Sequence, residues 1–265
     1  MYYTYKNGSV TVEGSGIAVI DARLSLNAFT EPLYLSSERH ALFYNAIAPV
    51  GGTMTLSYYL TGQDNIKTFI TNESNPISGN FGGLYFTSGY LKSYRLNCVP
   101  NNPVIVNAEI VFYQGLSGTF APTYIQATGT KILNYCDILL VDPSFGALGS
   151  ISGINSLALN FESDIQPLYV AGDSLPTSIT FGKKELNASF TVDIYSGYLP
   201  ITGISAGVQI NFTHPGISNL TESFTVSGHL YKRDFEASLG DFVRPRLFIK
   251  QGFSKKKYQN NRGRV

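Results

Sequence analysis

Only one string in this sequence has the spacing of a common catalytic motif. Gly203-Ile-Ser205-Ala-Gly207 matches Gly-x-Ser-x-Gly, in which the serine is a nucleophile held on a sharp turn between a strand and a helix. Here a strand-like run, Val208 to Phe212, follows the serine in place of a helix. The pattern therefore argues against a catalytic role for Ser205.

The remaining reactive side chains do not form a site either. None of the histidines, His40, His214 and His229, has a metal-ligand partner at close spacing, and Cys98 and Cys136 are far apart. There is no phosphate-binding loop and no HExxH string. The carboxylates Asp193, Asp234, Glu236 and Asp241 form no recognisable acid–base pair. We therefore expect no catalytic residue, metal or cofactor, and no enzyme.

The composition is that of an all-β protein with many turns. The 265 residues include 18 Tyr, 17 Phe and 26 Gly but no Trp, and 14% are charged. No apolar run approaches the ~20 residues of a membrane-spanning helix, and the N-terminal residues lack the pattern of a signal peptide. We expect buried free thiols, folding in a reducing cytoplasm and no membrane partner.

Charge is concentrated at the C-terminal end. Residues 253–265 hold five of the 19 basic residues and no acidic one, which leaves 14 basic and 18 acidic residues elsewhere. The basic residues of this tail, candidates for contact with phosphate or with an acidic neighbouring subunit, are Lys255, Lys256, Lys257, Arg262 and Arg264. The alternative is a solvated, disordered terminus.

A strand hairpin from Ser88 to Gly115 is the clearest local pattern. Pro100-Asn-Asn-Pro103 predicts its turn, because proline is excluded from the middle of strands and asparagine tolerates left-handed conformations. A β-branched and aromatic run from Val104 to Tyr113 forms the return strand. The sequence returns to this pattern later, since Ser227-Gly-His-Leu230 echoes Ser88-Gly-Tyr-Leu91.

Further echoes indicate an internal duplication. Leu24-Ser-Leu-Asn27 resembles Leu157-Ala-Leu-Asn160, Pro32-Leu-Tyr-Leu35 resembles Pro167-Leu-Tyr-Val170, and Gln114-Gly resembles Gln251-Gly. The echoes keep one order at a slowly drifting offset, as small insertions after a duplication would leave. We therefore divide the chain into a first β domain (1–116), a linker (117–130), a second β domain (131–252) and the basic tail (253–265).

Hydrophobic alternation predicts the strands of both halves. In the first half we expect strands at Ile17–Phe29 and Thr53–Leu60, and in the second at Ser156–Phe161 and Leu186–Tyr195. The segments expected to be loops or hairpins are Leu33–Gly52 and Ala171–Lys184, with a loop at Asn72–Gly83 and a glycine-rich turn at Tyr198–Gly207. Phe224–Leu230 and Tyr231–Ser238 are expected to be separate strands.

One short helix is expected. In Asp64–Thr71 the apolar residues Ile66, Phe69 and Ile70 repeat at i, i+3 and i+4, and Asp64 is placed to cap the first turn. The fold class that follows is all-β with at most one or two short helices, arranged as two tandem sandwich or barrel domains.

This order of elements resembles the tail tube proteins of tailed bacteriophages. The resemblance rests on strand, long loop, strand, short helix and then the hairpin SGYLKSYRLNCVPNNPVIVNAEIVFYQG, and it covers roughly residues 15–116 and 131–252. Most members of that family carry one tube domain and form hexameric rings. Some carry two and form trimers with pseudo-sixfold symmetry. The second half departs from the family pattern because it lacks the helix.

The resemblance implies a structural virion protein of the phage tail, assembled in the host cytoplasm. It would form stacked homo-oligomeric rings, contact other tail proteins and let DNA pass without sequence-specific binding, or serve as a related tube initiator, terminator or baseplate ring. Thr53–Leu60 and Leu186–Tyr195 would line the lumen. The candidates for contacts between rings are Glu38, Arg39, His40, Phe43, Tyr44, Asp173, Lys183 and Lys184.

Two other classes stay open from the sequence. Another viral β-sandwich, such as a capsid, decoration or receptor-binding protein, would also be all-β. A carbohydrate-binding or adhesive module would expose aromatic side chains on one sheet face, although the absence of Trp counts against it.

Overall fold

The structure is a computed structural model that describes most of the chain. The described residues are 10–17, 19–27, 30–33, 43–46, 51–62, 64–72, 74–99, 101–123, 132–133, 135–140, 150–151, 154–170, 175–192, 205–214, 217–236 and 244–252. Within these ranges the elements are strands apart from α1 (Thr68–Thr71), a helix of 4 residues. The prediction of an all-β fold with at most one or two short helices is confirmed.

The strands follow the two halves of the chain. The first half contains β1 (Val10–Val12), β2 (Ser15–Gly16), β3 (Val19–Asn27), β4 (Thr30–Leu33), β5 (Phe43–Ala46), β6 (Gly51–Tyr59), β7 (Ile77–Phe81), β8 (Leu84–Cys98), β9 (Ile105–Phe112) and β10 (Ser117–Gly118). The second contains β11 (Tyr135–Leu140), β12 (Ser150–Ile151), β13 (Ile154–Leu168), β14 (Ser178–Val192), β15 (Ser205–His214), β16 (Ile217–Glu236) and β17 (Arg244–Gly252).

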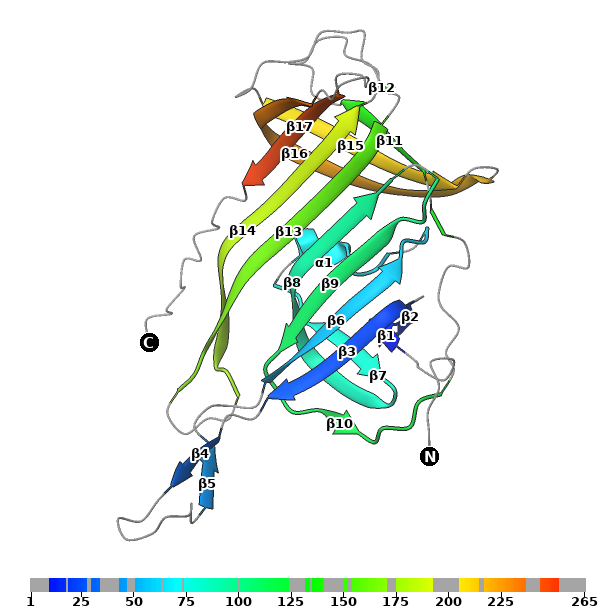
Figure 1. The fold of residues 1–265 in the computed structure, drawn as a ribbon. Helices are drawn as coiled ribbons and strands as arrows, with labels where there is room; N and C mark the ends of the chain where they lie inside the picture. The colour runs from blue at the N-terminus through cyan, green and yellow to red at the C-terminus, as the bar shows by residue number, and fades with distance from the viewer. Residues whose placement is uncertain are drawn as a thin grey trace, which may run out of the picture.

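One broad antiparallel sheet runs through both halves (Figure 1). Its strand order is β3-β6-β9-β8-β13-β14-β17-β16. The part from β3 to β8 comes from the first half, and the part from β13 to β16 from the second. The halves therefore meet edge to edge, where β8 pairs with β13.

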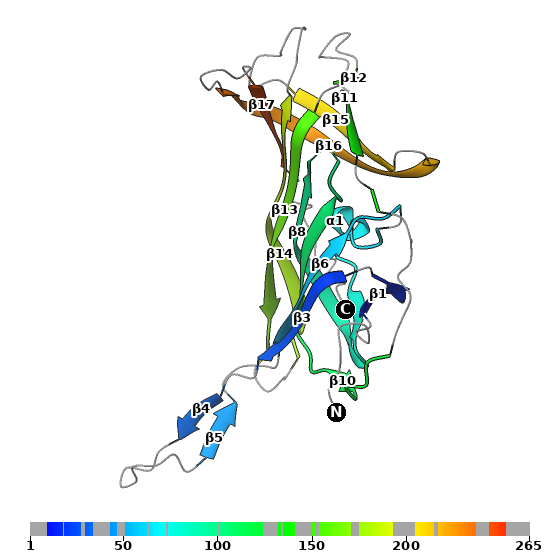
Figure 2. The ribbon, with the colours of Figure 1, turned by 45° about the vertical axis from the view of Figure 1, so that its right-hand side comes forward.

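A second layer covers one face of this sheet. In the first half it contains β1, β2 and β7, which pair with each other and with the beginning of β8. In the second half it contains β11, β12 and β15, which continue into the beginning of β16. Figure 2 shows α1 and β1 on the same side of the broad sheet, so the hydrophobic core lies between the layers.

Strict alternation of side chains builds this core. Met54, Leu56 and Tyr58 of β6 are buried, whereas the intervening Thr55 is exposed, as the period of 2 along a strand requires. Other members come from both halves and form one continuous cluster, including Phe86, Leu96, Phe112, Phe161, Phe190 and Phe212. The face of the broad sheet that points away from this core is polar.

The longest strand of each half bends at a glycine. β8 has 15 residues and β16 has 20, and each belongs to both layers. A Cβ on Gly89 would lie 2.8 Å from Ile110, and one on Gly228 would lie 2.1 Å from the carbonyl oxygen of Lys250. Only glycine therefore permits these bends, which lie in the Ser-Gly pairs of the sequence echo.

Several element predictions are wrong in their boundaries. Asn72–Gly83 was expected to be a loop but contains β7, and Phe224–Leu230 and Tyr231–Ser238 belong to the single strand β16. Ser205–Gly207 begins β15 and is not part of a turn. The turn after β8 agrees with prediction, because Asn101 has a left-handed backbone with φ 64.

Candidate functional site

Among the described residues, the groups considered from the sequence form neither a metal site nor a nucleophile elbow. The described residues contain no group of three His, Cys, Asp or Glu residues that could hold a metal ion. Ser205 is the first residue of β15, and the strand continues to His214, so the strand–turn–helix geometry of a nucleophile elbow is absent there. In the described part of the chain, no helix is long and apolar enough to cross a membrane.

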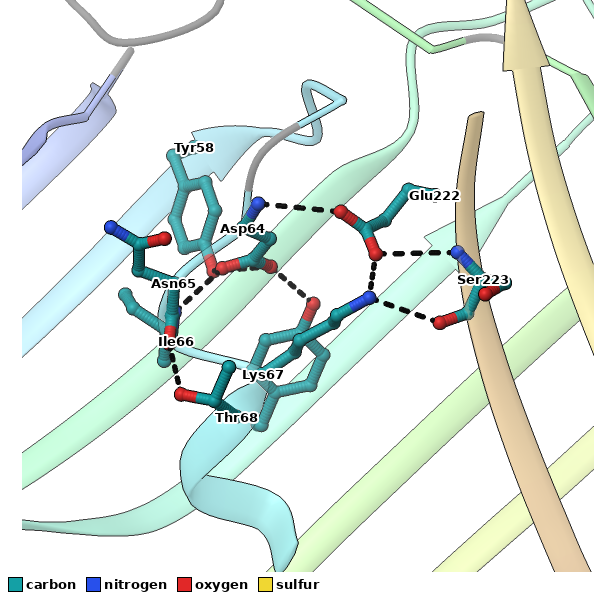
Figure 3. A network of polar contacts seen from close by, with 9 residues as sticks. Tyr58, Asp64, Asn65, Ile66, Lys67, Thr68, Glu222 and Ser223 are labelled. Carbon is teal, nitrogen blue, oxygen red and sulfur yellow. Dashed lines mark hydrogen bonds and ion pairs between the residues drawn. The ribbon is translucent and has the colours of Figure 1, made fainter. Parts of the chain in front are cut away.

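The most densely connected polar group is a buried carboxylate, Asp64 (Figure 3). The hydroxyl of Tyr94 donates to its Oδ2 at 2.7 Å, and the hydroxyl of Tyr58 lies 3.1 and 3.0 Å from the two carboxylate oxygens. The backbone N–H of Ile66 donates to Oδ1 at 2.9 Å. Asp64 thus fixes the turn before α1, but it does not cap the helix itself, whose N-cap residue is Lys67.

Burial shifts the pKa values of the Asp64 carboxylate and of the two tyrosine hydroxyls that contact it. Removal from water raises the pKa of Asp64 above its ordinary value, and the hydrogen bonds from Tyr94 and Tyr58 oppose part of that rise. Burial, together with the nearby Asp64, raises the pKa of both tyrosine hydroxyls well above 10. The tyrosines therefore remain protonated donors. The adjoining cavity, about 20 Å³, has room for one water and not for a substrate, so the geometry favours a structural role.

An ion pair connects the same turn to the second half (Figure 3). The ammonium of Lys67 contacts the carboxylate of Glu222 in β16 and donates to the carbonyl oxygen of Ser223 at 3.1 Å. The amide of Asp64 donates to the other oxygen of Glu222 at 3.4 Å. The ring of Phe224 lies beneath the Lys67 ammonium, 5.3 Å from it. Together these contacts hold the second layer of one half against the other half.

The two halves share one pattern of strand pairing. In β3–β6, a bulge separates the pairs Val19↔Tyr58 and Asp21↔Ser57. In β13–β14, a bulge separates Ile154↔Val192 and Ser156↔Thr191. Beyond the bulge, Leu24↔Met54 corresponds to Leu159↔Ala188. The order and the irregularity of these two pairs of strands are therefore the same.

The next pair of strands repeats the agreement. In β8–β9 a bulge follows Leu91↔Ile110, and in β16–β17 a bulge follows Leu230↔Ile249. In this register the two echoed glutamines are not equivalent, because Gln251 lies within β17 two residues after Ile249, whereas Gln114 lies four residues after Ile110. β-Bulges are specific features of a fold, so the agreement of the bulges supports an internal duplication.

The joint between the halves has no counterpart at the outer edges of the broad sheet. At the joint, the second part of β8 pairs with β13 from Ser93↔Glu162 to Cys98↔Leu157, and the guanidinium of Arg95 lies 2.8 Å from the carboxylate of Glu162. The equivalents of β8 and β13 are β16 and β3. Among the described residues, β3 pairs only with β6, and Lys232–Glu236 of β16 pairs only with β17. In the described part of the chain, the outer sides of β3 and of Lys232–Glu236 are therefore the open edges of the broad sheet.

Each half also carries a projecting hairpin, visible at the lower end of Figure 1. In the first half β4 pairs with β5 from Thr30↔Ala46 to Leu33↔Phe43. In the second, the outer parts of β13 and β14 pair in the same register, from Ile165↔Phe181 to Leu168↔Ser178. The tip of this second hairpin exposes Leu168, Tyr169, Val170 and Leu175.

The polar face of the broad sheet carries paired charges. The ammonium of Lys92 lies 2.9 Å from the carboxylate of Glu109, and Glu185 contacts both Lys183 and Lys250. The hydrogen bonds from Lys183 and Lys250 lower the pKa of Glu185 to about 2. With Arg95–Glu162, these pairs neutralise much of the charge on this face.

The candidate inter-ring residues are only partly described. Glu38, Arg39, His40 and Asp173 lie outside the described residues, as do the tail residues Lys255, Lys256, Lys257, Arg262 and Arg264. Phe43 and Tyr44 belong to β5 of the first hairpin. Lys183 and Lys184 lie on β14, further from its tip than Ser178. The sequence thus indicated a loop or hairpin at both places and named Asp64 only as a helix cap, whereas Glu222 and the open edges were missed.

The chain matches no protein-family model and no curated protein.

Proposed function

We propose that this protein is a structural subunit of a phage tail, which forms stacked rings of the tail tube through which DNA leaves the capsid. The active parts of such a protein are its surfaces. The proposal is supported by the absence of a built reaction site around Asp64 and by the architecture of the broad sheet. We also infer that the two halves arose by duplication of one tube domain.

One observation carries the proposal: the open edges of the sheet are the equivalents of the strands that join its two halves. A relationship that places the second half beside the first can be repeated between chains. A heterologous contact of this kind produces a closed ring when its rotation closes. Three chains with two halves each would give a ring of pseudo-sixfold symmetry.

The hairpins support the stacking of such rings. Both project from the same end of the sheet in matching register. The apolar side chains at the second tip, Leu168, Tyr169, Val170 and Leu175, would be costly to leave in water on a free subunit. Contact with the next ring would bury them.

The polar face suits a conduit for a polyanion. Four cationic side chains of this face, Lys92, Arg95, Lys183 and Lys250, are paired with Glu109, Glu162 and Glu185, so these cations are not free to hold phosphate groups. DNA would therefore pass this face without being retained.

Negative-stain electron microscopy across a concentration series tests the proposal. We expect rings or tubes with a central hole and threefold class averages. A uniform monomer or a closed globular dimer at every concentration would contradict the tube function. In that case a decoration or receptor-binding module would be the better description, and binding to purified capsids would be measured next.

A further inference from the structure

The open edges of the broad sheet expose side chains that are buried at its internal joint. Phe235 on β16 is 55% exposed, and its equivalent on β8, Leu96, is 0% exposed. Leu26 on β3 is 45% exposed, and its equivalent on β13, Phe161, is 0% exposed. The equivalences follow from the shared bulges of β8–β9 with β16–β17 and of β3–β6 with β13–β14.

Two positions that close the internal joint thus correspond to exposed apolar positions at the chain's two edges, one on β16 and one on β3.

We propose that these edges bind each other between copies of this chain, and that the internal joint sets the register. The Lys232–Glu236 part of β16 in one copy would pair antiparallel with Arg23–Asn27 of β3 in the next. Transferring the β8–β13 register places Ser25 opposite Asp234 and Leu24 opposite Phe235. The inference names the partner surface of the proposed ring and in that sense rests on the proposed function.

The chemistry of the two edges fits this register. Phe235, Leu24 and Leu26 would lie on the core-facing side of the extended sheet, as Leu96, Leu159 and Phe161 do at the internal joint. Arg23 would lie opposite Glu236, Leu26 opposite Arg233 and Asn27 opposite Lys232, so no like charges face each other. A slip by one residue would move Phe235 to the polar face, which makes the register specific.

One feature distinguishes the two joints. Within the chain, Glu222 of the second half pairs with Lys67 of the first. The correspondence of β7–β8 with β15–β16 places the position of Glu222 in the two-glycine turn Gly82-Gly83 of the first half, which has no side chain to pair. The joint between copies therefore lacks this ion pair, and we expect it to be weaker than the joint within the chain.

Cysteine cross-linking of the full chain tests the register. In S25C/D234C, the two thiols lie at opposite edges of one sheet and can meet only between copies. Mild oxidation of concentrated protein should yield disulfide-linked species of two chains and more, reversed by reductant. The single variants S25C and D234C should give no more cross-linking than the wild type, which carries Cys98 and Cys136 in the same background.

R23C/K232C is a matched control on the same strands and the same face. In the proposed register its thiols are displaced by four residues, roughly 13 Å along the strand, so it should not cross-link. Cross-linking of this control instead of S25C/D234C would overturn the register, as would rings in the microscope that S25C/D234C fails to link. Those results would leave the ring function in place.

Protein that stays monomeric at every concentration would contradict both the ring function and the proposed edge pairing. Disulfide-linked dimers formed by S25C or D234C alone would show that identical edges pair with each other, and they would overturn the proposed pairing of β16 with β3.

Discussion

The hydroxyl of Tyr94 donates a 2.7 Å hydrogen bond to the carboxylate of Asp64, and this bond connects the joint strand β8 to the turn before α1. Tyr58 of β6 donates to the same carboxylate from the other side. The ring of Tyr94 also contacts Phe224 of the second half. A single acidic residue thus organises the point at which the broad sheet, α1 and the second half meet.

Replacement of Asp64 by alanine should destabilise the fold by about 2–4 kcal/mol. The two tyrosine hydroxyls and the amide of Ile66 would lose their acceptor in a buried position, and unsatisfied buried donors are costly. Urea denaturation monitored by circular dichroism measures the change. Asp21→Ala, which removes an exposed carboxylate from β3, is the control and should change the free energy of unfolding by less than about 0.5 kcal/mol.

The stability difference between the wild type and Asp64→Asn should depend on pH. The pKa of Asp64 is raised in the folded state by burial, so the protonated form is favoured by folding. Its contribution to stability is fully present below the unfolded pKa of about 3.9 and is lost as the pH rises through the folded pKa. Because the asparagine does not titrate, the wild type should gain stability relative to this variant as the pH falls from 7 toward 4. An unchanging difference over that range would show that the pKa of Asp64 is not raised.

The Lys67–Glu222 pair should control how tightly the second layer of the second half is held. In Glu222→Gln, Lys67 loses its charged partner, and we expect amide exchange in β15 and β16 to accelerate about tenfold. Exchange in β6 and β9 should change little, because their pairing does not involve this contact. Hydrogen exchange with mass spectrometry distinguishes the two regions. Lys92→Met, which removes an exposed ion pair of the polar face, should leave β15 and β16 unchanged.

The sequence predicted strands better than it predicted their register. The echo of Leu24-Ser-Leu-Asn27 in Leu157-Ala-Leu-Asn160 aligns Leu24 with Leu157, whereas the strand pairing aligns Leu24 with Leu159. A shift of two residues preserves the alternation of faces, so hydrophobic patterning cannot detect it. The bulges at β3 and β13 fix the alignment, and they have no clear signature in composition.

The site was less accessible to sequence reasoning than the fold. Asp64 was recognised as a helix cap because it precedes Ile66, Phe69 and Ile70, but its main partners, Tyr58 and Tyr94, are brought to it by long-range pairing. Similarly, nothing in the local sequence marks Glu222 as the partner of Lys67, 155 positions before it. The Ser-Gly echo was read only as a sign of a repeat, and the structure shows that a local steric requirement for glycine operates at both of its positions.

Two exposed apolar side chains should separate ring formation from ring stacking. Phe235→Glu places a charge on the open edge of β16 and should prevent rings, whereas Leu175→Glu alters the tip of the second hairpin and should leave single rings that do not stack. Analytical ultracentrifugation and negative-stain microscopy report both states. Each variant should keep the thermal midpoint of the wild-type monomer within a few degrees, because neither residue is in the core. Loss of rings in Leu175→Glu would reassign the hairpin to the lateral contact.

Removing the acidic partners on the polar face should convert it into a surface that binds DNA. In E109Q/E162Q/E185Q the cationic side chains of Lys92, Arg95, Lys183 and Lys250 lose their ion pairs, and binding of a labelled duplex should appear at low salt. Its affinity should fall steeply with added salt, as counterion release requires, and fluorescence anisotropy measures both. Glu13→Gln, an acid removed from β1's turn in the other layer, should not bind. Equal DNA binding by the wild type would show that the paired charges do not protect this face, and the conduit proposal would lose its electrostatic support.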